Sequence, residues 1–297
     1  MCIFATVNNT IKAHIYLFLA QLIYALNYSV AKDLMPDHIH PFALVFLRIF
    51  GAMILFWALS FFLPKEKIEK SDLKKILLLA LFGTVINQLF FIYGLSLTTP
   101  INSAIIMVSN PIVVIAFTLL ILKEKITLFK LGGLFLGICG ALTLLLFRGN
   151  FELGSETMAG DFLTLINSMS WATFVVLAKP LMKKYQVSTL MKWVFLFGFI
   201  MILPIGFTHL PDTNWSSFGI DVYLKLSFVV IATTFLAYLL NVHALKELSP
   251  SVVSMYIYFQ PFLASLFAIA IGMDEINAIK IVSGILIILG VYLVSKK

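Results

Sequence analysis

Two carboxamide–proline pairs stand near the centre of two long apolar runs. Asn110 precedes Pro111 in the run 100–122, and Gln260 precedes Pro261 in the run 250–272. A proline inside a helix removes one N–H donor and displaces the carbonyl four residues earlier, and a buried amide side chain needs a hydrogen-bond partner. We therefore expect both helices to kink near their middle and both amides to face one cavity as ligand-binding groups. The alternative is that each amide only bonds a neighbouring helix.

The spacing of these pairs belongs to an internal repeat. A shift of 150 residues keeps its register without a gap along the chain, and a shift of 147 extends the match to the start of each half. The first shift aligns Thr84 with Thr234, Leu95 with Leu245, Pro100 with Pro250 and Gly140 with Gly290; the second aligns Tyr24 with Trp171 and Lys32 with Lys179. The repeat predicts two homologous halves, 1–150 and 151–297.

The composition indicates a polytopic membrane protein. Hydrophobic residues make up 61% of the chain, charged residues 12%, and the mean hydropathy is +1.03, which does not describe a domain covered by solvated side chains. A spanning helix needs about 20 mainly apolar residues. Ten stretches qualify, at 13–31, 41–63, 73–97, 101–122, 127–147, 159–182, 189–207, 222–245, 250–272 and 277–294. We expect an all-α integral membrane protein of ten transmembrane helices. The two cysteines, Cys2 and Cys139, offer no disulfide framework and no metal spacing.

Each half contains five of these stretches, so the second half must enter the membrane from the opposite side. The repeat is therefore expected to be inverted. Inverted repeats are typical of secondary transporters, in which the substrate lies near the membrane midplane between the halves. This pattern is the strongest functional argument in the residues themselves.

Basic residues predict the orientation. With the N-terminus inside, 16 of the 21 Lys and Arg residues fall on the cytoplasmic side, and Arg48 alone lies well within a span. Lys and Arg in short loops stay on the cytoplasmic side, so we expect both termini to be cytoplasmic. The net charge of +7 follows from this distribution, and we expect no nucleic-acid partner.

Four segments carry a resemblance to a known family. They are SAIIMVSNPIVVIAFTLLILKEK and SVVSMYIYFQPFLASLFAIAIGMDE, each with a mid-helix proline and an acidic residue past its end, followed by GGLFLGICGALTLL and SGILIILGVYLV. With them, nearly the whole chain resembles the ten-helix EamA type of the drug/metabolite transporter superfamily. The resemblance implies a bacterial-type inner-membrane carrier that exports amino acids or other small metabolites by alternating access through a cavity between its halves. An exporter of cationic drugs or other toxic compounds is the alternative. One departure is that Arg48 has Phe195 at the equivalent position.

Further candidate binding residues surround the amide pairs. Tyr24 and Trp171 form an equivalent aromatic pair, which either flanks a substrate or only packs against neighbours or lipid. Arg48 lies about 10 Å inside its helix, where it either serves function or snorkels to the interface. The remaining candidates are Asn87 and Gln88, their repeat-related neighbour Tyr238, and Tyr256, which lies one turn from Gln260.

Other functional classes have less support. The chain contains no H-E-x-x-H, no G-x-S-x-G and no P-loop glycine pattern, and no Asp or Glu in the middle of a span, so we expect no enzyme, no metal site and no cofactor. A membrane scaffold or sensor remains an alternative. The expected partners are a small-molecule substrate and the lipid bilayer. Substrate identity, coupling ion, and the choice between a monomer and a homodimer stay open.

Overall fold

The computed structural model describes residues 2–147, 157–270 and 275–296, with side chains from Asn9 onward. The described part of the chain is helical and contains no strand. The first half holds α1 (Cys2–Leu34), α2 (Pro41–Phe61), α3 (Leu73–Ala80), α4 (Asn87–Leu97), α5 (Pro100–Met107), α6 (Asn110–Leu122) and α7 (Leu128–Leu146). The second half holds α8 (Met158–Met182), α9 (Val187–Gly206), α10 (Ile220–Ser227), α11 (Ala237–Glu247), α12 (Pro250–Met255), α13 (Phe259–Ala270) and α14 (Ala278–Ser295).

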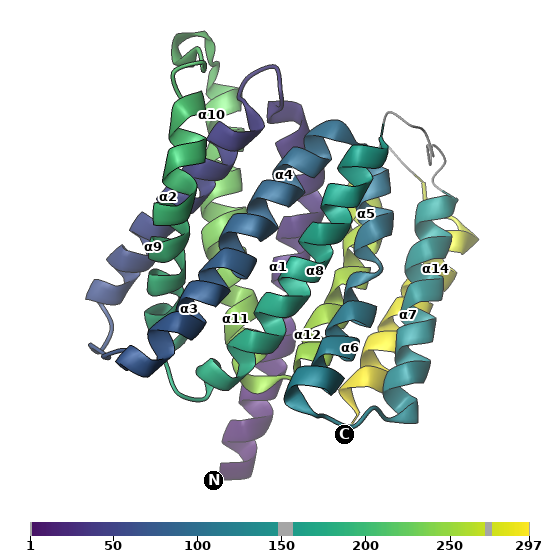
Figure 1. The fold of residues 1–297 in the computed structure, drawn as a ribbon. Coiled ribbons are helices and arrows are strands. Elements are labelled where there is room, and N and C mark those ends of the chain that lie inside the picture. The colour runs from purple at the N-terminus through teal and green to yellow at the C-terminus, as the bar shows by residue number, and fades with distance from the viewer. Residues whose placement is uncertain (1, 148–156, 271–274, 297) are drawn as a thin grey trace.

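These helices form ten segments long and apolar enough to cross a membrane, which confirms the predicted number. The segments are Asn9–Leu34, Pro41–Phe61, Lys70–Leu97, Pro100–Leu122, Leu128–Leu146, Met158–Met182, Val187–His209, Ile220–Glu247, Pro250–Ala270 and Ala278–Ser295. α1 begins and α14 ends at the same end of the bundle, as an even number of spans requires (Figure 1). The predicted boundary between the halves at 150–151, and the predicted last two residues of the ninth span, lie outside the described residues.

The third and eighth spans each contain a π-helical segment at repeat-related positions, Leu81–Ile86 and Phe228–Leu236. Inside each, a threonine hydroxyl donates to a carbonyl of the preceding turn: Thr84 to Ala80, and Thr234 to Val229 at 2.8 Å. A π segment widens the turn and rotates the side chains that follow it, and such segments often occur at functional sites. Asn87, Gln88 and Tyr238 follow directly.

The fourth and ninth spans are interrupted just before their central prolines. The first breaks between α5 and α6 at residues 108–109, ahead of Pro111, and the second passes through a 3-10 turn, Tyr256–Tyr258, ahead of Pro261. The two breaks touch each other, because the Tyr258 hydroxyl donates to the Val108 carbonyl at 3.2 Å. These two residues are 150 positions apart and so are partners in the sequence repeat.

The closest helix pairs join the first half of the chain to the second. α7 and α14 lie side by side at one edge of the bundle (Figure 1). Their backbones meet at glycines: a Cβ on Gly133 would lie 2.5 Å from the Gly290 carbonyl oxygen, which is the close approach that small residues permit in membranes. The pairs α2–α9, α4–α8 and α1–α11 also pack together. The centre of the bundle is thus built from both halves.

A lysine repeats the same contact in each half. The Lys32 ammonium donates to the carbonyls of Leu95, Ser96 and Thr98, each at 2.9 Å. The Lys179 ammonium donates to those of Leu245, Lys246 and Leu248, at 2.8, 3.2 and 2.8 Å. Each lysine thereby satisfies the last carbonyls of a helix, α4 or α11. Because α1 and α8 run in opposite directions (Figure 1), the two contacts lie at opposite ends of the bundle.

Candidate functional site

A cavity lies at the centre of the bundle between the two halves. It offers about 70 Å³ to the centres of water molecules, several times the roughly 10–15 Å³ that one water needs. Helices α1, α2, α4, α5, α8, α11, α12 and α13 and the 3-10 turn before Pro261 all contribute to its wall. The lining residues are Gln21, Tyr24, Asn27, Tyr28, Arg48, Asn87, Gln88, Phe91, Met107, Asn167, Trp171, Tyr238, Asn241, Val253, Ile257 and Gln260.

Arg48 brings a positive charge to this cavity. Its side chain on α2 is 3% exposed, and its Nε donates to the Gln88 carboxamide oxygen at 2.9 Å. Its Nη1 is buried and has no hydrogen-bond partner among the described residues. Arg48 thus lines the cavity and does not extend to the surface of the bundle.

A chain of hydrogen bonds connects α4 to the second half of the molecule. The Tyr238 hydroxyl on α11 lies 2.7 Å from the Gly83 carbonyl and 2.8 Å from the Asn87 side-chain oxygen. Asn167 on α8 donates from Nδ2 to the Asn87 carbonyl at 2.7 Å. The π-helical segment before Asn87 makes these contacts possible, because it turns the start of α4 towards the cavity. The wall is therefore held in place by both halves.

Other lining residues contribute amides and aromatic rings. Gln260 donates from Nε2 to the side-chain oxygen of Gln21 at 2.7 Å, so α13 and α1 are joined across the halves. Trp171 packs edge-on against Tyr238, with ring centroids 5.5 Å apart. Tyr24 also lines the cavity. Neutral amides, aromatic rings and one guanidinium can bind a small molecule and orient it.

Two of the sequence-predicted binding residues lie elsewhere. Asn110 is fully buried where α6 meets α8 and donates from Nδ2 to the Ser168 carbonyl at 2.7 Å. Tyr256 contacts His14, its hydroxyl 2.7 Å from the ring nitrogen Nδ1. Neither lines the cavity. Of the two amides, Gln260 lines the cavity, whereas Asn110 lies against α8.

Several lining residues were not anticipated from the sequence, although a signal for them existed. Gln21, Asn27 and Tyr28 lie three or four residues from Tyr24, and Asn167 lies four residues from Trp171. Side chains at these spacings share one helix face. The polar residues one turn from Tyr24 and Trp171 are therefore candidates on the sequence as well.

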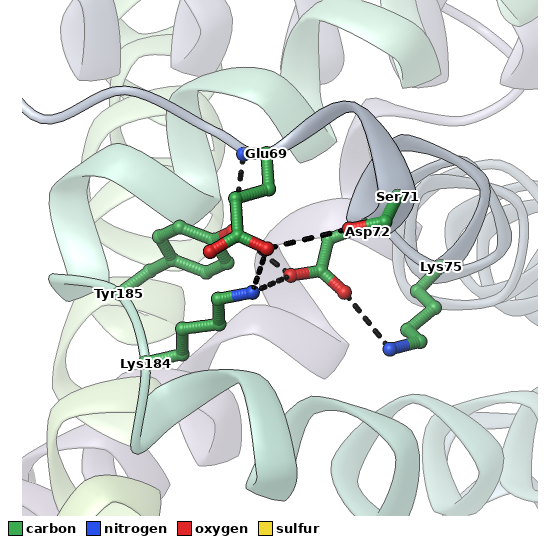
Figure 2. A network of polar contacts seen from close by, with 6 residues as sticks. All are labelled: Glu69, Ser71, Asp72, Lys75, Lys184 and Tyr185. Carbon is green, nitrogen blue, oxygen red and sulfur yellow. Dashed lines mark hydrogen bonds and ion pairs between the residues drawn. The ribbon is translucent and has the colours of Figure 1, made fainter.

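A second polar network lies outside the cavity, at the end of the bundle that holds both termini. Asp72, at the start of the third span, is 3% exposed. Its carboxylate contacts Lys184 at 2.6 Å and Lys75 at 2.8 Å, and it accepts from the Tyr185 hydroxyl at 2.8 Å (Figure 2). Glu69 also pairs with Lys184, at 2.5 Å. The hydrogen bond that Lys184 donates to Asp72 raises the pKa of Lys184 above its usual value. This network joins the loop before α3 to the loop after α8, and so joins the two halves.

Comparisons with known proteins agree with this architecture. The model of the EamA-like transporter family matches residues 11–146 and 158–296. A protein of Archaeoglobus fulgidus named as an uncharacterized transporter is 28% identical, with 96% of this chain and 98% of that protein covered. A WAT1-related protein of Arabidopsis thaliana is 27% identical over 91% of this chain and 75% of its own length. A solved crystal structure, 17% identical, has a TM-score of 0.75 and covers 95% of this chain and 96% of that one.

These matches bear on the class of activity as well as on the fold. The family model covers nearly the whole described chain in two blocks. The names of the family and of the relatives point to a membrane transporter rather than to an enzyme. Among the residues that the structure describes, no group of three or more His, Cys, Asp and Glu side chains could hold a metal ion.

Proposed function

The chain belongs to the EamA-like transporter family, and on that premise we propose that it is a secondary transporter that exports small metabolites such as amino acids. The observation that carries the proposal is the cavity, whose polar wall is made by both halves of the molecule. Secondary transporters bind their substrates at such a midplane site between repeats. A scaffold would need no polar cavity that is walled by both repeats.

Alternating access is supported by different contacts between the halves at the two ends of the bundle. At the end with the termini, Asp72 pairs with Lys184. At the other end, Asp33 pairs with Lys225 at 2.5 Å, and the rings of His40 and His209 stack 4.0 Å apart. Opening the cavity towards one side requires the contacts at that end to separate while the others hold. The repeat-related contacts of Lys32 and Lys179 and of Val108 with Tyr258 support an inverted repeat about which such a movement takes place.

We assign the end with the termini to the cytoplasm of a bacterial-type inner (plasma) membrane. The support for this orientation is the excess of Lys and Arg at that end. With this orientation, the Asp72 network closes the cytoplasmic side and the histidine stack closes the outer side.

Cysteine accessibility tests the transport cycle without knowledge of the substrate. Asn241 lines the cavity, and the hydrogen bond recorded for it among the described residues stays within its own helix, to the Ala237 carbonyl at 2.8 Å. Asn241→Cys should therefore leave the fold intact. In a background with Cys2→Ser and Cys139→Ser, a membrane-impermeant thiol reagent should label this cysteine from either face of the membrane. Asn110→Cys, at the interface between α6 and α8, is the matched control and should be labelled from neither face.

The outcome separates a carrier from a scaffold. Labelling of Asn241→Cys from one face only, or from neither, would contradict alternating access. Efflux of labelled amino acids from proteoliposomes then tests the substrate class.

A further inference from the structure

The guanidinium of Arg48 carries a buried positive charge that the protein leaves without an opposite charge. A guanidinium stays protonated in proteins. The side chain is 3% exposed, its one hydrogen bond that the structure records goes to the neutral Gln88 side chain, and its Nη1 has no partner among the described residues. Burying an unpaired charge is costly. Such an arrangement persists when something else supplies the missing charge.

No acidic side chain of the described protein can supply it. The residues that line the cavity include no Asp or Glu. Asp72 is the one buried acid in the described part of the chain, and it is already bound to Lys184, Lys75 and Tyr185. The described part of the protein therefore offers the guanidinium no carboxylate.

The rest of the wall indicates what this molecule carries besides its charge. Five aromatic side chains line the cavity, those of Tyr24, Tyr28, Phe91, Trp171 and Tyr238. The side-chain oxygens of Asn27 and Asn167 are buried and lack a hydrogen-bond partner among the described residues. Rings favour a flat apolar body, and carboxamide oxygens accept from an N–H or O–H group.

We propose that the cavity binds a small organic carboxylate with a flat, apolar or aromatic body, and that Arg48 recognises the carboxylate. The planar guanidinium matches a carboxylate in shape and can donate two parallel hydrogen bonds to it. This assignment rests on the proposed transport function and gives it a substrate class. It also disfavours cationic drugs, because a cation would meet the charge of Arg48 with no acid to offset it.

The test compares three probes of nearly equal shape on the purified full-length protein. Phenylacetate is the anion, phenylacetamide is its neutral isostere, and 2-phenylethylamine is the cation. We expect phenylacetate alone to raise the melting temperature in a concentration-dependent manner, while sodium chloride and sodium phosphate at the same concentrations do not. Equal effects of the three probes, or no effect of phenylacetate, would overturn the assignment, and an equal effect of the inorganic salts would show a site for any anion.

Substitutions test whether phenylacetate binds through Arg48. Arg48→Gln should weaken phenylacetate binding roughly 10- to 100-fold, the loss expected for a charge-assisted bidentate contact. Lys192→Gln is the control: it removes a positive charge that lies over the Trp57 ring, outside the cavity, and should leave binding unchanged. Unchanged binding in Arg48→Gln would overturn the proposal.

A second variant covers the case in which Arg48→Gln fails to fold. Gln88→Glu places a carboxylate beside the guanidinium, at the position of the present 2.9 Å hydrogen bond. The internal charge should replace that of the ligand, so this variant should melt at a higher temperature without ligand and should lose its response to phenylacetate. A retained response would contradict the role of Arg48. The labelling of Asn241→Cys does not depend on these probes, so the transport function and the substrate class can fail separately.

Discussion

The two charged side chains that are buried in the described protein, Arg48 and Asp72, are treated in opposite ways. Each is 3% exposed. Asp72 receives hydrogen bonds or ion pairs from Lys184, Lys75 and Tyr185, whereas the one recorded hydrogen bond of Arg48 goes to the neutral Gln88. A buried charge with its partners in place joins parts of a structure. A buried charge that lacks them, beside a cavity, is ready for a ligand.

The largest change in melting temperature and ligand response is expected when the buried charge of Arg48 is removed together with its neutral partner. Arg48→Met combined with Gln88→Leu replaces the charge and its neutral partner by apolar groups of similar size. Such replacements of buried ionic groups are often stabilising, by about 1–4 kcal/mol. We therefore expect a higher melting temperature without ligand and a complete loss of the response to phenylacetate. A lower melting temperature in this double variant would mean that Arg48 supports the fold rather than the ligand.

Removing the charge of Asp72 should change the melting temperature in the opposite direction. Asp72→Asn keeps the shape of the side chain and removes the charge that holds Lys184 and Lys75. We expect a lower melting temperature and unchanged phenylacetate binding. Labelling of Asn241→Cys from the side of the termini should become faster, because the contact that closes that end is weakened.

A surface charge at the same network provides the control. The Lys75 side chain is 66% exposed, and exposed ion pairs contribute little. Lys75→Ala should therefore change neither the melting temperature nor the labelling rate appreciably. Equal effects of Asp72→Asn and Lys75→Ala would remove the distinction between a buried and an exposed charge.

The two amides extend the comparison to neutral groups. Gln260→Leu removes a hydrogen bond in the cavity wall, and a hydrogen bond contributes about 0.5–1.5 kcal/mol, so ligand affinity should fall by up to about tenfold. Asn110→Leu should lower the melting temperature and leave affinity unchanged, since Asn110 bonds Ser168 outside the cavity. Binding titrations with phenylacetate on both variants decide this. A loss of affinity in Asn110→Leu would return that residue to the binding site.

The fold followed from the sequence because its signals are long. The ten apolar stretches and the 150-residue repeat each extend over many residues. An error at one position therefore changes neither the number of helices nor the repeat. The site was harder. Asn110 and Gln260 are equivalent in the repeat, yet the first lies against α8 and the second in the cavity wall.

The difference arises from local backbone geometry that residue types do not display. One span is interrupted at two residues and the other passes through a 3-10 turn, and π-helical segments precede Asn87 and Tyr238. Each changes the direction of the following side chains by part of a turn. Arg48 was identified from its depth in the membrane, but the absence of an acid near it required the packed structure.

The smallest change in stability is expected from His40, which becomes charged only at low pH. His40, ahead of α2, accepts from the Phe42 N–H through Nδ1 at 3.3 Å and stacks on His209. Burial, and then the neighbouring charge of His209, lower the pKa of His40 below its usual value, while Asp212 opposes this. The unfolded chain therefore binds the proton more tightly than the folded one does.

The sign of the pH dependence follows. The contribution of His40 is fully present above the usual histidine pKa of about 6.5 and is lost as the pH falls below it. His40→Asn keeps an N-cap acceptor without titrating, so its melting temperature should fall less than that of the native protein between pH 7.5 and pH 5.5. Equal falls would show that protonation of His40 is compensated in the folded protein, as the charge of Asp72 is and that of Arg48 is not.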